Sequence, residues 1–210
     1  MKTAMISALN RALQTANDLQ KLAASWLVAT LAILAAANAG AQAVTVISNS
    51  SYAQDCYRAA AATALKLSAS RDDLATCTRA LEYENLTRND QARTYINRGI
   101  VQTALEKYQD ALADYNAASN LVPDMPEAFI SRGNLWFLAE KYQRAVSEYT
   151  QAMQMDFSRM HIAYYNRGLA NENLGKREEA MADYREALKL APDFKQALDR
   201  LDILGKPPAQ

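Results

Sequence analysis

Residues 164–168 have the sequence YYNRG, and closely related stretches occur upstream as YINRG at residues 95–99 and FISRG at residues 129–133. Gly99 and Gly133 lie 34 residues apart, and Gly133 and Gly168 lie 35 apart. A fixed period of about 34 residues is typical of stacked helical hairpins. The glycine would cost a helix about 1 kcal/mol relative to alanine, so its recurrence indicates a packing role. We number each repeat from its first residue, which is Ala92, Pro126 or His161.

Small and aromatic residues recur at other positions of the same period. Position 4 is aromatic, position 8 is glycine, positions 20 and 27 are alanine, and position 24 is tyrosine in all three repeats. Position 32 is proline in the first and third repeats and Phe157 in the second. Small residues allow two helices to approach closely, and aromatic rings fill the space beside them. The pattern therefore predicts pairs of antiparallel helices with a close contact at the glycine.

These positions resemble the tetratricopeptide repeat. The first repeat carries the pattern in full, as Tyr95, Gly99, Ala111, Tyr115, Ala118 and Pro123. The resemblance covers Ala92 to Phe194, and the protein resembles exported bacterial members of the family. It implies an all-α fold: a right-handed superhelical array of antiparallel hairpins, with three regular repeats, a degenerate first hairpin and a C-terminal capping helix.

The N-terminal 43 residues differ in composition from the rest of the 210-residue chain. Basic residues precede an apolar run from Leu22 to Ala37, and small residues follow it. This order is typical of a secretory signal peptide, and we place its end at Ala41. The run is shorter than the roughly 20 residues that span a bilayer, so we favour cleavage over an uncleaved membrane anchor. The expected location is the periplasm or the outside of the cell, with inner-membrane anchoring as the alternative.

The chain has two cysteines, Cys56 and Cys77, and both follow the predicted signal peptide. An even number of cysteines in a secreted chain suggests a disulfide. The segment between them predicts two helices joined by a turn at Ser68 to Ser70, which would bring the cysteines together. Two buried thiols are the alternative. A metal site is not expected, because the pair lacks the close ligand spacing and the chain has a single histidine, His161.

The predicted organisation follows from these segments. Residues 1–41 are the signal peptide or anchor, 42–53 a linker and 54–91 the degenerate cysteine-containing hairpin. Residues 92–204 hold the repeats, at 92–125, 126–160 and 161–194, and the capping helix, and 205–210 form a tail. Aligning Ala80 with position 27 places Cys77 at position 24.

The residue types of an active site are scarce. A serine–histidine–aspartate triad would depend on His161, which we expect at an exposed helix start. No phosphate-binding glycine loop is present. The formal net charge is zero, which argues against a nucleic-acid partner. We expect no catalysis and no cofactor.

Three charged pairs recur at positions 7 and 23. Each pair spans 16 residues, which places its members on the two helices of one hairpin. We predict structural ion pairs, because a buried charge without its partner is costly. The pairs are Arg98 with Asp114, Arg132 with Glu148, and Arg167 with Asp183.

The resemblance also suggests where a partner would bind. In tetratricopeptide proteins the first helices line a concave groove, and asparagines at position 6 can hold an extended peptide through its backbone. Position 6 here is Asn97, Ser131 and Asn166, and further groove candidates are Ile100, Asn134 and Tyr165. Arg93 is the only basic residue that we find at a groove position, which disfavours the subtype that clamps a peptide carboxylate. The sequence thus predicts a non-enzymatic interaction module or adaptor of the cell envelope that binds a protein or peptide. The alternative is a membrane-tethered structural or assembly factor.

Overall fold

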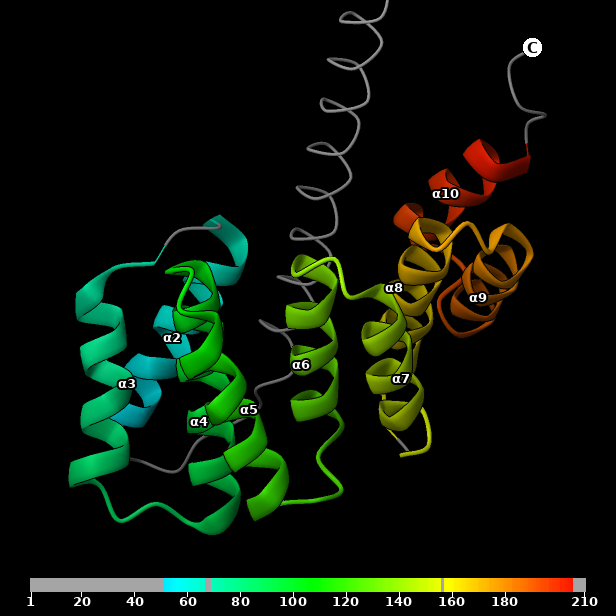
Figure 1. The fold of residues 1–210 in the computed structure, drawn as a ribbon. Coiled ribbons are helices and arrows are strands. Elements are labelled where there is room, and N and C mark those ends of the chain that lie inside the picture. Colours follow the sequence, from blue (N-terminus) through cyan, green and yellow to red (C-terminus); the bar gives the residue numbers. More distant parts are fainter. Residues whose placement is uncertain (1–50, 67–68, 156, 206–210) are drawn as a thin grey trace, which may run out of the picture.

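The computed structural model describes residues 51–66, 69–155 and 157–205, and this part of the chain is all helical apart from its turns and loops (Figure 1). The predicted signal peptide and most of the predicted linker lie outside these residues. No helix within the described ranges is long and apolar enough to cross a membrane.

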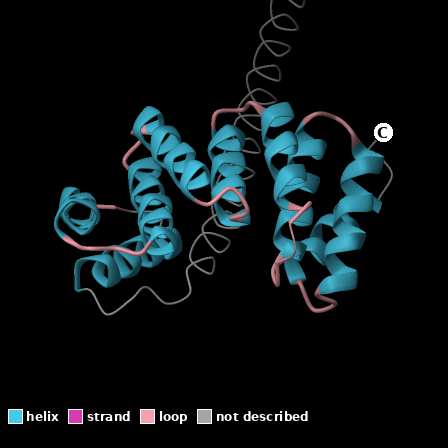
Figure 2. Cartoon of the chain, turned by 90° about the horizontal axis from the view of Figure 1, so that it is seen from below, coloured by secondary structure: helices cyan, strands magenta, loops and turns pink. Residues whose placement is uncertain are grey.

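The helices form successive antiparallel hairpins followed by one last helix (Figures 1 and 2). The N-terminal hairpin is α2 (Ser51–Lys66) and α3 (Arg71–Tyr83). The three regular hairpins are α4 (Arg88–Ala104) with α5 (Tyr108–Leu121), α6 (Pro126–Leu138) with α7 (Tyr142–Ala152), and α8 (Met160–Asn173) with α9 (Arg177–Leu190). The last helix is α10 (Lys195–Gly205), which packs against α9. The predicted all-α repeat array is confirmed.

Local sequence signals explain where several helices begin and end. Ser70 and Asp73 form a reciprocal capping box at the start of α3, which satisfies backbone N–H groups that have no partner within the helix. Thr87 accepts a hydrogen bond from the Asp90 N–H at the start of α4. Pro126 opens α6, at a position where the missing N–H has no cost. Pro123 and Pro192 follow the ends of α5 and α9.

Several predicted boundaries are wrong by a few residues. Helix α2 begins at Ser51, so residues 51–53 are helical and do not belong to a linker. Helix α4 begins at Arg88, four residues before Ala92, the first residue of the repeat. The reason is that Thr87 caps the helix upstream of the positions that recur in the three repeats. Gly205 ends α10, so the predicted tail is helical at its first residue, and its other residues lie outside the described part.

First helices of neighbouring hairpins contact one another, α2 with α4, α4 with α6, and α6 with α8. The second helices α3, α5 and α7 each contact the first helix of the next hairpin. Each hairpin therefore packs against the next with both of its helices, as expected for a repeat array in which neighbours bury one another's apolar faces.

Candidate functional site: the face of the first helices

The contact between glycine and tyrosine is the centre of each regular hairpin. Gly133 lies so close to Tyr149 that a Cβ atom built on the glycine would be 2.6 Å from the ring atom Cε1. The corresponding distances are 2.5 Å from Gly99 to Tyr115 and 2.6 Å from Gly168 to Tyr184. Any side chain at these glycines would overlap with the ring, so glycine is required for close approach rather than for backbone freedom.

The tyrosine hydroxyls reach back to the first helix of their own hairpins. Tyr149 donates to Asn134 Oδ1 at 2.8 Å, and Tyr184 donates to Glu172 Oε2 at 2.9 Å. Burial raises the pKa of both phenols, because desolvation penalises the charged form. These hydroxyls therefore stay protonated and act as hydrogen-bond donors.

The arginines at position 7 contact the acidic residues predicted for them. Arg98 donates two hydrogen bonds to Asp114, at 2.7 and 2.8 Å. Arg167 contacts Asp183 at 2.7 Å. Arg132 Nη2 lies 2.8 Å from Glu148 Oε2, without the alignment of a hydrogen bond. The hydrogen bonds that Arg98 donates to Asp114 raise the pKa of Arg98, against the opposing effect of burial.

Two of these arginines also join neighbouring hairpins, which the sequence pattern did not predict. Arg132 Nη1 donates to Asn116 Oδ1 on α5 at 2.8 Å. Arg167 Nη1 donates to Thr150 Oγ1 on α7 at 3.1 Å. Asn116 and Thr150 both hold position 25 of the preceding repeat, so a recurring polar residue at position 25 was the available signal. Each of these arginines thus fixes both the pairing of its own helices and the stacking of its hairpin on the previous one.

Replacing Arg132 with methionine is expected to lower the free energy of unfolding by about 2–3 kcal/mol, since Glu148 would be left with its charge unpaired in a mostly buried position. Thermal unfolding followed by circular dichroism should show a melting temperature lower by roughly 5–10 °C. Arg185 is exposed on α9, and Arg185→Met is the control. Equal melting temperatures for Arg132→Met and the control would contradict a structural role for the pair.

The predicted groove residues lie deeper than expected. Most of them are buried, with exposed fractions of 0% for Asn97, 5% for Ser131, 9% for Asn134, 3% for Asn166 and 3% for Tyr165. Ile100 is partly buried. The expectation that an open groove presents all these side chains is therefore wrong.

Helix packing is the physical reason for this burial. Asn166 Nδ2 on α8 donates to Asn134 Oδ1 on α6 at 3.1 Å, so positions 6 and 9 meet where neighbouring first helices touch. Tyr165 packs against Phe194, with ring centroids 5.1 Å apart. The asparagines in these hairpins thus bind one another rather than facing solvent.

Asn97 differs from Asn166 although both hold position 6. Its side chain is fully buried, and within the described ranges neither its Oδ1 nor its Nδ2 atom has a hydrogen-bond partner. A buried polar group without a partner costs about 1–3 kcal/mol. This residue therefore destabilises the structure in which it is covered.

Accessible side chains on the first helices lie at other groove positions. Arg93 and Glu127 hold position 2 and are partly exposed, and Asn173 holds position 13 and is exposed at the end of α8. The Arg93 side chain lies 3.9 Å from Asp90 and is 31% exposed. We call Arg93, Glu127 and Asn173 the accessible groove residues. Of these three, the sequence had singled out only Arg93, as the basic residue at a groove position.

His161 is not the exposed helix start that the sequence suggested. Its ring packs edge to face against Phe194, with centroids 5.3 Å apart. Desolvation lowers the pKa of His161, and the nearby Arg159 lowers it further, while Asp193 opposes the shift. Among the described residues, no group of three or more histidine, cysteine, aspartate or glutamate side chains could hold a metal ion.

The lowered pKa of His161 gives a pH dependence of stability. Because the unfolded chain binds a proton more readily than the folded one at this site, the histidine favours the folded state above the unfolded-state pKa of about 6.5, and this contribution is lost as the pH falls. The melting temperature should therefore fall from pH 7.5 to pH 5.5 by more in the wild type than in His161→Gln. The difference should be small, since the ring is partly exposed. An identical decline in both proteins would contradict this assignment.

Two family models described as tetratricopeptide repeat match the chain, one over residues 89–156 and one over residues 161–194. No curated protein sequence matches the chain.

Solved structures of tetratricopeptide repeat domains are similar in fold. The second such domain of human RPAP3, solved in complex with the HSP70 peptide SGPTIEEVD, has a TM-score of 0.53 and 29% identity, over 58% of this chain and 100% of that one. The first such domain of Spaghetti (RPAP3), bound to the HSP90 peptide SRMEEVD, has a TM-score of 0.53 and 27% identity, over 56% of this chain and 92% of that one. MamA from Desulfovibrio magneticus RS-1 has a TM-score of 0.57 at 17% identity, over 74% of this chain and 85% of that one. At this identity the similarity is evidence for a shared fold only.

The period, the glycine–tyrosine contacts, the family matches and the similar domains agree, and the chain is a tetratricopeptide repeat protein.

Proposed function

We propose that this protein is a non-catalytic interaction module of the cell envelope, which binds an extended segment of a protein partner across the face of α4, α6 and α8. Its family generally serves as an interaction scaffold, and two of the similar domains were solved with bound peptides. The observation that carries the proposal is the side-by-side arrangement of these three first helices.

The accessible groove residues define the chemistry of this face. Arg93 offers a cation and Glu127 an anion on neighbouring first helices, and Asn173 offers an amide at the far end. An extended peptide presents alternating backbone donors and acceptors, which an amide can match. The mixture of charges favours a partner segment that carries both signs over a purely acidic one.

A double charge swap tests this surface. In Arg93→Glu/Glu127→Lys the net charge stays the same, while the charge pattern of the face is inverted. We expect an affinity pull-down from the native envelope to lose at least 90% of the partner that the wild type captures. The matched control is Arg185→Glu/Glu179→Lys, which inverts two exposed charges on the second helix α9 and should keep the partner. Equal capture by the two double variants would reject the face of α4, α6 and α8 as the binding surface.

The envelope location rests on the basic and apolar order of the N-terminal sequence. Mass spectrometry of the protein purified from its source should find a new N-terminus at Gln42. An intact N-terminus in a membrane fraction would instead support the alternative, an assembly factor tethered to the inner membrane.

A further inference from the structure

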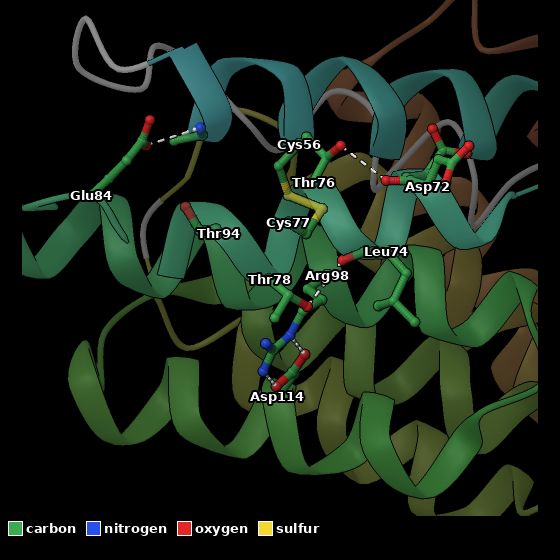
Figure 3. The surroundings of a disulfide bond; sticks show 12 residues. Cys56, Asp72, Leu74, Thr76, Cys77, Thr78, Glu84, Thr94, Arg98 and Asp114 are labelled. Carbon is green, nitrogen blue, oxygen red and sulfur yellow. Dashed lines mark hydrogen bonds and ion pairs between the residues drawn. A yellow bond between two sulfur atoms is a disulfide. The ribbon is translucent and has the colours of Figure 1, made fainter. Parts of the chain in front are cut away.

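The N-terminal hairpin lacks the glycine–tyrosine contact of the other three. Cys77 holds position 24 on α3, where the regular hairpins have tyrosine, and the residue that meets it from α2 is Cys56. The two form a disulfide with a Cα–Cα distance of 4.6 Å (Figure 3). Both cysteines are fully buried. A covalent bond thus stands where packing of an aromatic ring holds the later hairpins together.

The side chains of α2 that the structure describes bury little apolar area. Those that are buried are small: Ala53, Cys56, Ala60, Thr63 and Ala64. Apolar stabilisation grows with the area removed from water, and an alanine buries far less than the tyrosines of the regular hairpins, since an aromatic side chain buries 150–250 Å². At the N-terminus of α2, the Glu84 carboxylate accepts hydrogen bonds from the N–H groups of Tyr52 and Ala53, at 2.8 and 3.0 Å.

Helix α4, against which α2 packs, also carries a buried polar group that α2 does not satisfy. In the third regular hairpin, position 6 is Asn166, which finds its partner Asn134 on the preceding first helix α6. For Asn97 on α4 the preceding first helix is α2, and neither amide atom of Asn97 has a hydrogen-bond partner among the residues that the structure describes. The hydroxyl of Thr63 on α2 is likewise buried and has no partner in that part of the chain. These groups favour release of α2 because water or a ligand would satisfy them.

We propose that α2 is a cover locked by the Cys56–Cys77 disulfide, and that reduction of this bond releases α2 and exposes Asn97 as an additional binding position for an extended peptide. The reductant is a dithiol: it delivers two electrons and two protons, the S–S bond breaks to give two thiols, and the dithiol becomes a disulfide. The binding of an extended peptide at Asn97 rests on the proposed function, whereas the release of α2 does not.

Hydrogen–deuterium exchange of the full chain tests the release. In Cys56→Ala/Cys77→Ala, peptides from residues 51–66 should exchange about 100-fold faster or more than in the oxidised wild type. Peptides from α8 and α9 should keep their wild-type rates. Wild type treated with dithiothreitol should match the double variant. Unchanged exchange in α2 would overturn the proposal, and so would equal acceleration in α8 and α9, since the bond would then support the whole array.

Thiol labelling tests the exposure of position 6 in the same double variant. Asn97→Cys should react with a thiol reagent at least about tenfold faster than Asn166→Cys. The reason is that α2 moves away from α4 in this variant, whereas α6 stays packed against residue 166. Equal labelling rates at the two sites would overturn the exposure of Asn97. Neither experiment uses a partner, so a failed charge-swap pull-down would count against the proposed function without affecting this result.

Discussion

Replacing Gly133 with valine is expected to destabilise the protein by about 3 kcal/mol, the upper end of the range for overpacked cores. Even the first added carbon would lie 2.6 Å from Cε1 and 2.8 Å from Cδ1 of Tyr149. The ring cannot move aside, because Tyr149 is 1% exposed and its hydroxyl is bonded to Asn134. Urea unfolding followed by circular dichroism at 222 nm measures the effect.

A double-mutant cycle assigns this loss to the ring. Tyr149→Ala alone should cost about 3–5 kcal/mol through the cavity that it leaves. In that background the valine at residue 133 fills part of the space, so it should cost at least about 1 kcal/mol less than in the wild type. Gly205→Val is the control, since no atom of the described residues lies within 4 Å of a Cβ at that glycine. Additive effects of the two substitutions would contradict a direct glycine–tyrosine contact.

Replacing Asp183 with alanine is expected to cost about 3 kcal/mol, the lower end of the range for breaking a buried ion pair. Asp183 is 4% exposed and accepts hydrogen bonds from Arg167 and from Asn171 Nδ2. Without it, Arg167 would keep its bond to Thr150 on α7 but lose its charge partner. We place the loss at the lower end because the Arg167 side chain is 24% exposed.

The exposed Glu178 on α9 provides the control, since Glu178→Ala should change the free energy of unfolding by less than about 0.5 kcal/mol. A second variant, Asp183→Asn, keeps the shape and one acceptor oxygen but removes the charge. Its loss in free energy of unfolding should lie between those of Asp183→Ala and Glu178→Ala. Chemical unfolding of the three proteins under the same conditions gives the comparison. An effect of Asp183→Ala no larger than that of Glu178→Ala would show that the recurring pairs do not stabilise the hairpins.

The sequence was sufficient to predict the fold because the residues that make each contact recur at the same spacing in all three repeats. A single glycine in a helix has many explanations, but Gly99, Gly133 and Gly168 at one spacing with tyrosine 16 residues later have a common one. The same spacing predicts the partners of Arg98 and Arg167, because residues at positions 7 and 23 lie on facing helices of one hairpin. Periodic information of this kind is local to a hairpin and its neighbour.

Burial on the first helices could not be predicted in the same way. Position 6 faces a neighbouring hairpin, so its exposure depends on a residue one repeat away and on how closely the helices approach. Asn166 and Asn134 meet across such a contact, and no pattern within one repeat indicates this. The burial of Asn97 is harder still to predict, because α4 packs against the N-terminal hairpin of α2 and α3, whose sequence has lost the repeat pattern except at Cys77 and Ala80.

Photo-cross-linking tests most directly whether the face of α4, α6 and α8 binds a partner. A benzophenone amino acid is placed at residue 93 or 173 on the first helices, and at Ser147 or Arg185 on the second helices, where both control residues are exposed. We predict that irradiation in the native envelope joins the same partner to residues 93 and 173, and not to residues 147 and 185. Cross-linking of that partner mainly through residues 147 and 185 would contradict the proposed binding face.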